Sequence, residues 1–191
     1  LYFEPTLSEN NGNKVLSMKL KTSENAYLEY VYTLPKEGYM LDVAVRSQGL
    51  SGVVNTSKPM NIDWKLQARR MEKSVTYENR YTQATVQYDG DRISRLSQGG
   101  NDEQKEEKVN WVAYKQHLFT SVLISDNPFA KGNFVSHNIA MSEGKDVKYT
   151  KNFLTSLPIQ AKSGELSESL HFYFGPSDYN VLKQYNDKYE L

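Results

Sequence analysis

The sequence contains no cysteine among its 191 residues, which excludes a structural disulfide and a cysteine-based zinc site. It has no signal peptide and no apolar run of about 18 residues, the length that a membrane-spanning helix needs. Basic and acidic residues balance at 23 each, so the chain has no general excess of positive charge for the phosphates of a nucleic acid. These absences predict a soluble domain without a nucleic-acid partner.

Motifs that signal catalysis or cofactor binding are also lacking. Gly99-Gly100 belongs to neither of the glycine-rich phosphate-binding patterns, and the sequence has no G-x-S-x-G segment. The three histidines, His117, His137 and His171, each stand alone in a predicted strand, with no spacing that would gather them around one metal ion. We therefore expect no enzyme activity, no cofactor and no metal.

What the sequence does contain is short segments in which apolar and polar residues alternate. Period-two alternation places successive side chains on opposite faces of a strand. Residues 35–38 read as a turn, and Asp89-Gly90 predicts a hairpin, because a type I′ turn needs positive φ at both central residues. The clearest alternating runs cover residues 16–20, 28–34, 41–45, 62–68 and 84–88. Their regular spacing predicts an all-β, mainly antiparallel sandwich over residues 1–174.

The middle of the chain is harder to interpret. Residues 97–110 include ten successive residues without an apolar side chain, from Gly99 to Lys108, and we predict a surface loop there. Residues 111–124 are apolar at both parities, which predicts one strand buried on both faces. Its first face would carry Val112, Tyr114, Leu118, Val122 and Ile124, and its second Trp111, Ala113, Phe119 and Leu123. After Asn127-Pro128 we expect strands at Phe134–Met141, Val147–Leu154 and Leu170–Phe174.

The periodicity changes at residues 175–191. Tyr179, Leu182, Tyr185 and Tyr189 are spaced by three, three and four residues, which predicts one stripe of a helix. We expect Gly175 to break the preceding strand, Pro176 to begin the helix, and Ser177 or Asp178 to cap it. The stripe, from Tyr179 through Leu182 to Tyr185, should pack on the sandwich. No stop signal follows, and the first residues open inside an apolar run, so we expect the polypeptide to continue beyond both ends.

Two segments carry a family resemblance. The first is Trp111-Val112-Ala113-Tyr114-Lys115-Gln116-His117-Leu118-Phe119, and the second is Phe174-Gly175-Pro176 followed by Ser177-Asp178-Tyr179-Asn180-Val181-Leu182. In this order they resemble the large periplasmic domain of YidC/Oxa1-type membrane protein insertases, in its Bacteroidetes-like form. The matching residues are Trp111, Ala113, Lys115, Gln116, Phe119, Phe174, Gly175, Pro176, Tyr179 and Leu182.

The resemblance implies a β-supersandwich of the galactose-mutarotase-like type, with a C-terminal helix that leads toward a transmembrane segment. It places the domain on the periplasmic side of the bacterial inner membrane, tethered to that membrane in the full-length protein. The implied partners are the Sec translocon with its accessory subunits, and nascent membrane-protein substrates. The implied role is docking and positioning rather than chemistry. Family domains carry further strands before the point at which this chain opens, so we expect N-terminal strands to be missing.

The mutarotase-like fold also supplies the alternative, a carbohydrate-binding or sugar-active protein. Enzymes of that fold use a glutamate base and a histidine acid, and Glu168 and His171 are close in sequence. However, Glu168 and His171 are three positions apart, and in a strand this spacing places the two side chains on opposite faces. A second alternative is an adhesin-like interaction module.

Overall fold

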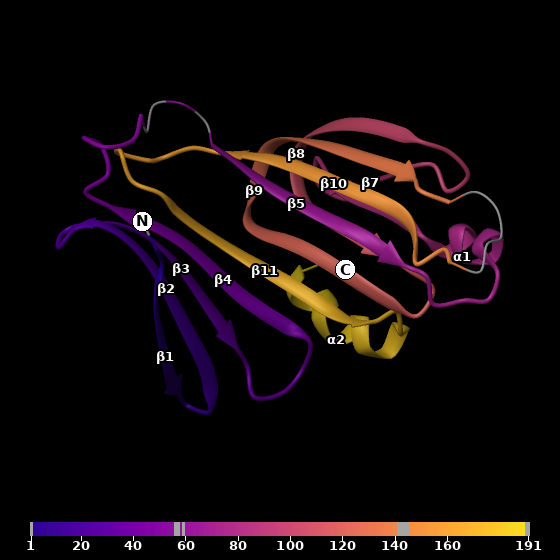
Figure 1. Ribbon diagram of the computed structural model, residues 1–191, viewed down its shortest axis with the longest axis horizontal. Helices are drawn as coiled ribbons and strands as arrows, with labels where there is room; N and C mark the ends of the chain where they lie inside the picture. Colours follow the sequence, from indigo (N-terminus) through magenta and orange to yellow (C-terminus); the bar gives the residue numbers. More distant parts are fainter. Residues whose placement is uncertain (1, 56–57, 59, 141–145, 190–191) are drawn as a thin grey trace.

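The computed structural model describes residues 2–55, 58, 60–140 and 146–189, and shows an antiparallel β protein with two short helices (Figure 1). Leu1, Met141 and Glu190-Leu191, which belong to segments discussed above, lie outside the described residues. The elements are β1 (Glu4–Asn10), β2 (Asn13–Ser23), β3 (Ala26–Leu34), β4 (Met40–Gln48), β5 (Met60–Arg69), α1 (Val75–Tyr81), β6 (Gln83–Tyr88), β7 (Arg92–Arg95), β8 (Asp102–Lys115), β9 (Phe119–Asn138), β10 (Tyr149–Ile159), β11 (Ser167–Pro176) and α2 (Tyr179–Tyr189).

The strands form one continuous sheet that folds into two layers. Its main path runs β1-β2-β3-β4-β11-β9-β8-β6-β7, and β10 joins it through β9 and carries β5 on its other side. The 20-residue strand β9 links the layers, because residues 119–125 pair with β11 whereas residues 133–138 pair with β10. The predicted class, mainly antiparallel β with a C-terminal helix, is therefore confirmed.

The strand alternation separates two apolar cores. The larger core lies between the layers and includes Val43, Tyr114, Leu123, Phe153 and Leu170. The smaller core lies on the opposite face of β8, β9 and β11, beneath α2. We call these two faces of the main sheet the inner face and the outer face. Segment 111–114 contributes to both cores, so the prediction that it is buried on both faces is confirmed.

Two polar side chains are fixed inside the larger core. Tyr114 is fully buried, and its hydroxyl donates to the backbone carbonyl of Trp64 (3.1 Å) and shares a hydrogen bond with the Thr155 hydroxyl (2.6 Å). Burial raises the pKa of this hydroxyl. The Lys151 side chain is also buried, and its ammonium donates to the carbonyls of Thr82 (2.9 Å) and Gln98 (2.7 Å). Burial lowers the pKa of Lys151 to about 8.

The predicted loop at residues 97–110 is wrong from residue 102 onward. Strand β8 begins at Asp102, and its charged segment pairs in register with β9, from Asp102 opposite Ser136 to Glu107 opposite Lys131. Main-chain hydrogen bonds hold this segment, and its side chains alternate between half-buried and exposed. Backbone pairing needs no apolar side chain, so composition alone could not reveal the strand.

The prediction of a single strand over residues 111–124 is also wrong. The chain reverses at Gln116-His117-Leu118, with the Gln116 N–H donating to the Phe119 carbonyl (2.8 Å). Because of this reversal, the odd- and even-numbered residues of 119–124 face the opposite sides of the sheet from those predicted. Val122 and Ile124 therefore join Trp111 and Ala113 on the outer face, while Leu123 joins the inner core. None of the three turn residues is a glycine, proline or asparagine, the usual turn signals.

Other turn predictions had mixed outcomes. The Asp89-Gly90 hairpin is confirmed, with φ of 46° and 90° at the two residues. Asn127-Pro128 does not begin a new strand, because β9 continues through it at a register shift against β8. Proline is tolerated there because a bulge leaves its residues outside the regular hydrogen-bond ladder. Helix α1, capped by the Ser74 side chain, was not predicted.

Candidate docking site at the C-terminal helix

The junction between β11 and α2 is built around a glycine. The predictions that Gly175 breaks the strand and that Pro176 begins the helix are both wrong. Both residues lie in β11, opposite Thr120 and Phe119 of β9. A Cβ atom at Gly175 would lie 2.5 Å from the Tyr173 ring, which is fully buried. Glycine is needed because the Tyr173 side chain crosses over it, and the Tyr173 hydroxyl then donates to the Pro176 carbonyl (2.8 Å).

The first turn of α2 is anchored to the turn between β8 and β9. The Ser177 N–H donates to the Leu118 carbonyl (2.8 Å), and the Ser177 hydroxyl donates to the Gln116 carbonyl (3.3 Å). Asp178 then caps the helix, because its Oδ1 accepts from the N–H groups of Asn180 (2.9 Å) and Val181 (3.1 Å). Of the two predicted capping residues, Asp178 has this role and Ser177 is the anchor.

The body of α2 lies on the outer face of the sandwich (Figure 1). The buried residues beneath it are Met40, Trp111, Ala113, Val122, Ile124 and Tyr173, and the helix contributes Val181, Leu182, Tyr185 and Tyr189. The Tyr185 hydroxyl accepts from the Tyr39 N–H (3.0 Å). A Cβ at Gly38, where φ is +95°, would lie 2.9 Å from that hydroxyl, so both the backbone angle and the close approach favour glycine.

Helix α2 is held on the surface of the domain rather than within it. None of its residues is fully buried. Tyr179, which was predicted to pack on the sandwich, is 74% exposed, and Val181 takes its place. The contact stripe consists of Val181, Leu182, Tyr185 and Tyr189, and Tyr179, the first residue of the helix, lies outside it.

The other residues singled out from the sequence fall into separate groups. Trp111 and Ala113 come together with Leu182 under the helix. Gln116 supports the junction and also donates from Nε2 to the Arg69 carbonyl (2.9 Å). Phe119 and Phe174 are about half exposed, and Phe174 stacks on the inner-face ring of Phe172 at 5.6 Å. Lys115 is an exposed residue at the end of β8.

A charged cluster near the far end of α2 escaped the sequence analysis. His171, which is buried, has Nδ1 2.6 Å from Asp42 Oδ1 and Nε2 2.9 Å from Asp126 Oδ1. Both ring nitrogens can donate only when the imidazole carries a positive charge. The ring also contacts Tyr189 of α2 at 5.0 Å. A hydrogen bond with Tyr189, together with the charges of Asp42 and Asp126, raises the pKa of neighbouring Lys188.

Glu168 and His171 do not form an acid–base pair, because they lie on opposite faces of β11. Glu168 lies opposite Val45 of the inner core, whereas His171 lies on the outer face, as their spacing predicted. Burial raises the pKa of Glu168. Within the described residues, no group of three or more His, Asp or Glu side chains is arranged so that it could hold a metal ion. None of the helices in the described part of the chain has the length and apolar character to cross a bilayer.

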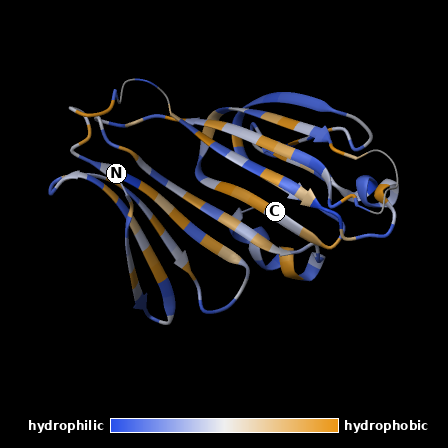
Figure 2. Cartoon of the chain, in the orientation of Figure 1, coloured by the Kyte–Doolittle hydropathy of each residue, from blue (hydrophilic) through white to orange (hydrophobic). Residues whose placement is uncertain are grey.

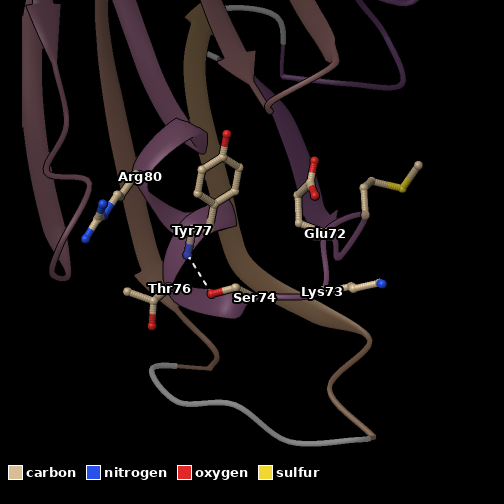
Figure 3. Close-up of a pocket in the computed structure, with 7 residues that line it drawn as sticks. Glu72, Lys73, Ser74, Thr76, Tyr77 and Arg80 are labelled. Atoms are coloured by element: carbon tan, nitrogen blue, oxygen red, sulfur yellow. Dashed lines mark hydrogen bonds between the residues drawn. The ribbon is translucent and has the colours of Figure 1, made fainter.

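An open pocket lies beside α1. It has a volume of about 650 Å³ and is lined by Met71, Glu72, Lys73, Ser74, Thr76, Tyr77 and Arg80 (Figure 3). Lys73 and Arg80 point to opposite sides, so their charges do not converge on a ligand (Figure 3). Glu72 is instead paired with His117 at 2.8 Å. The pocket therefore adds nothing to the docking site.

The fold and the site together define an antiparallel β-sandwich whose outer face carries its own C-terminal helix. Comparison with known proteins gives the family. Residues 2–191 match the family model described as the YidC periplasmic domain, and the chain belongs to this family. That finding confirms the family and the periplasmic location that the resemblance implied.

Curated relatives agree with this assignment. The membrane protein insertase YidC of Bacteroides fragilis strain ATCC 25285 is 30% identical over 196 residues, covering 100% of this chain and 31% of the relative. That of Porphyromonas gingivalis strain W83 is 34% identical over 191 residues, covering 97% and 29%. This chain thus spans about a third of the length of these relatives.

Solved structures support the fold alone. The galactosidase domain of the alpha-galactosidase-sucrose kinase AgaSK has a TM-score of 0.50 and 8% sequence identity, over 94% of this chain and 26% of that one. This likeness agrees with the predicted galactose-mutarotase-like architecture. At such low identity it gives no support to the sugar-active alternative.

Proposed function

We propose that this chain is the docking and positioning domain of a membrane protein insertase, assisting the insertion and folding of inner-membrane proteins. The observation that carries the proposal is the contrast along α2. Its first turn is fixed by Gly175, Ser177 and Asp178, while its body rests on the outer face without a fully buried residue. The start of such a helix is fixed in position, whereas the rest of it can move relative to the sheet.

The physical route begins at the sandwich. The Tyr173–Pro176 hydrogen bond and the Ser177 contact with Leu118 set the direction in which α2 leaves β11. The Tyr185 contact with Tyr39 and the Tyr189 contact with His171 then hold the helix along the sheet. A partner that binds the sandwich would thereby be placed at a defined position relative to whatever follows the helix.

The partners we propose are nascent membrane-protein substrates and the Sec translocon with its accessory subunits. The names of the curated relatives, membrane protein insertases, support the first. The Sec translocon follows from the sequence resemblance. A net charge of zero agrees with protein partners better than with nucleic acid. We expect no enzyme activity, and a sugar epimerisation activity lost in His171→Ala would contradict this.

The test is made in the full-length insertase that contains this domain. Leu182→Pro removes a main-chain donor inside α2 and should break the helix. We expect this variant to impair insertion of a Sec-independent substrate more than deletion of residues 1–170 does. Gln184→Ala, an exposed substitution in the same helix, is the matched control and should insert normally. The proposal is wrong if the sandwich deletion abolishes insertion while Leu182→Pro leaves it intact.

A further inference from the structure

Exposed aromatic and apolar side chains gather along one margin of the domain. Three of them belong to α1 or to the segment before it, and the others to the β3–β4 turn, the β8–β9 turn and the start of α2. Their exposed fractions range from 39% to 74%. We call this margin the turn rim, and it consists of Tyr39, Met71, Tyr77, Tyr81, Leu118 and Tyr179.

Contacts between neighbouring elements show that the turn rim is continuous. The His117 ring stacks on Tyr81 with centroids 4.6 Å apart and meets Tyr77 edge-on at 5.5 Å. These contacts join α1 to the β8–β9 turn. The Leu118 carbonyl accepts from the Ser177 N–H (2.8 Å), which joins the same turn to the start of α2.

The β3–β4 turn completes the turn rim. Tyr39 packs against Tyr173, beside the β11–α2 junction, with ring centroids 6.1 Å apart. In Figure 1 the turn rim follows the lower and right-hand margin of the domain, from the β3–β4 turn past the start of α2 to α1. Side chains that project from several turns along one margin can meet a flat surface together, whereas an extended or helical peptide needs a continuous groove or strand edge.

Basic side chains are gathered around α1 and the end of β5. Figure 2 shows the segment between these two elements largely in blue, the colour of hydrophilic residues. Nearby acidic groups are engaged, since Glu72 lies 2.8 Å from His117, and Glu78 is buried with its Oε2 accepting from two backbone N–H groups (2.7 Å each). Asp146 and Lys148, just before β10, carry opposite charges. Within the part of the chain that the structure describes, four exposed cations have no ion-pair partner: Arg69, Lys73, Arg80 and Lys115.

We infer that the turn rim lies on the surface of a bilayer that contains anionic lipids. Tyrosine suits the boundary between headgroups and acyl chains, because its ring is apolar and its hydroxyl stays hydrated. Exposed lysine and arginine side chains are attracted to anionic headgroups, and a flat array of headgroups does not require these charges to converge on one point. The family's place on the periplasmic side of the inner membrane brings such a surface within reach. The inference does not depend on which protein the domain docks.

Binding of the 191-residue chain to vesicles tests the role of the charges. Flotation is measured with vesicles of phosphatidylcholine, with and without about 30% phosphatidylglycerol. The salt concentration is about 0.1 M, where screening over about 10 Å limits the attraction to nearby charges. The rim variant combines Lys73→Glu with Arg80→Glu. The matched control combines Lys131→Glu with Lys162→Glu, which change the net charge equally at an exposed site near the opposite end of β10.

We expect the wild type to bind the anionic vesicles about tenfold more tightly than the neutral ones, or more. The rim variant should lose about tenfold or more in affinity, because each cation near an anionic surface contributes about fivefold. The control variant should stay within about twofold of the wild type, since its charges lie beyond the screening distance. Equal losses in the two variants, binding that does not need the anionic lipid, or an absence of binding would overturn the inference.

A probe in the full-length protein tests the placement. The chain has no cysteine, so Leu118→Cys, in a background without other cysteines, carries a single fluorophore at the turn rim. Val53→Cys is the matched control, because residue 53 is 61% exposed and lies between the far ends of β4 and β5. In reconstituted membranes, lipids with a nitroxide on the headgroup should quench the Leu118 probe about threefold more strongly than the Val53 probe, or more, because the rim lies at headgroup depth.

Equal quenching of the two probes would overturn the inference. Shielding of the Leu118 probe that appears only when the Sec translocon is added would also overturn it, because the turn rim would then be covered by a protein rather than by lipid.

Discussion

On the inner face of β11, Leu170 packs within a core closed by a second layer of strands, whereas on its outer face Tyr173 packs beneath a single short helix. The inner cover is held by paired strands, such as β10 with β9 and β5. The outer cover is held by its first turn and a few tyrosine contacts. The same strand thus supports one cover that stabilises the domain and another that can be released at modest cost.

Polar side chains buried on the two faces meet different partners. Lys151, at the end of the inner core, meets backbone carbonyls, which carry only partial charges, and burial lowers its pKa. His171, on the outer face, has a carboxylate oxygen within hydrogen-bond distance of each ring nitrogen.

The largest predicted effect tests the inner core. Phe153 is 1% exposed and stacks on Tyr114 at 4.8 Å. Phe153→Ala should lower the free energy of unfolding by about 3–5 kcal/mol, because it removes apolar contacts and leaves a cavity. Chemical denaturation followed by tyrosine and tryptophan fluorescence measures the loss. If the loss is no larger than that caused by Leu182→Ala in α2, the second layer of strands stabilises the domain no more than the helix does.

An intermediate effect is predicted for Lys151 as the pH changes. Burial lowers the pKa of Lys151 to about 8 in the folded protein, from the ordinary lysine value of 10.5. Between these values the unfolded state binds more protons, so the contribution of Lys151 to stability should rise with pH and level off above about 10.5. The carbonyl contacts offset part of the burial cost, so we expect a gain of about 1–2 kcal/mol.

The free energy of unfolding is measured for the wild type and for Lys151→Met at pH 7.5, 9 and 10. The variant serves as the control because its tyrosines ionise over the same pH range as those of the wild type. The stability of the wild type should increase relative to that of the variant over this range. A difference that stays constant with pH would show that the buried lysine keeps its ordinary pKa.

The smallest predicted effect belongs to the outer cover. Leu182 packs on the outer core but is only half-buried. Leu182→Ala should therefore cost about 1 kcal/mol, below the range of about 2–5 kcal/mol for fully buried leucines. The exposed Gln184→Ala in the same helix should change stability by less than about 0.5 kcal/mol. A loss from Leu182→Ala as large as that from Phe153→Ala would mean that α2 is part of the main core.

The sequence predicted the fold best where one face of a strand is exposed to solvent. Strands β2 to β6 were located from alternation alone, because solvent on one face imposes a period of two. Alternation did not reveal the β8–β9 turn, because apolar residues continue through the reversal at Leu118 and Phe119. It also did not reveal the strand from Asp102 to Lys108, because backbone pairing supports that strand without apolar side chains.

The candidate docking site was predicted in part. The spacing of Leu182, Tyr185 and Tyr189 located the helix and most of its contact stripe, because helical periodicity is local. The role of Gly175 was misread, since the sequence cannot reveal that the Tyr173 ring crosses above it. The charged cluster could not be anticipated, because Asp42, Asp126 and His171 come from three strands brought together only by the fold.

Helix α2 runs back along β11, with Tyr185 over Tyr173 and Tyr189 over His171. Tension applied at the end of the helix would therefore detach it one contact at a time, starting at Tyr189, before any strand pairing carried load. Its eleven residues lengthen by about 20 Å when they change from helical to extended. The helix would thus extend under a pulling force before the sandwich unfolds, so that the end of the chain could be displaced while the β-sheet stays intact.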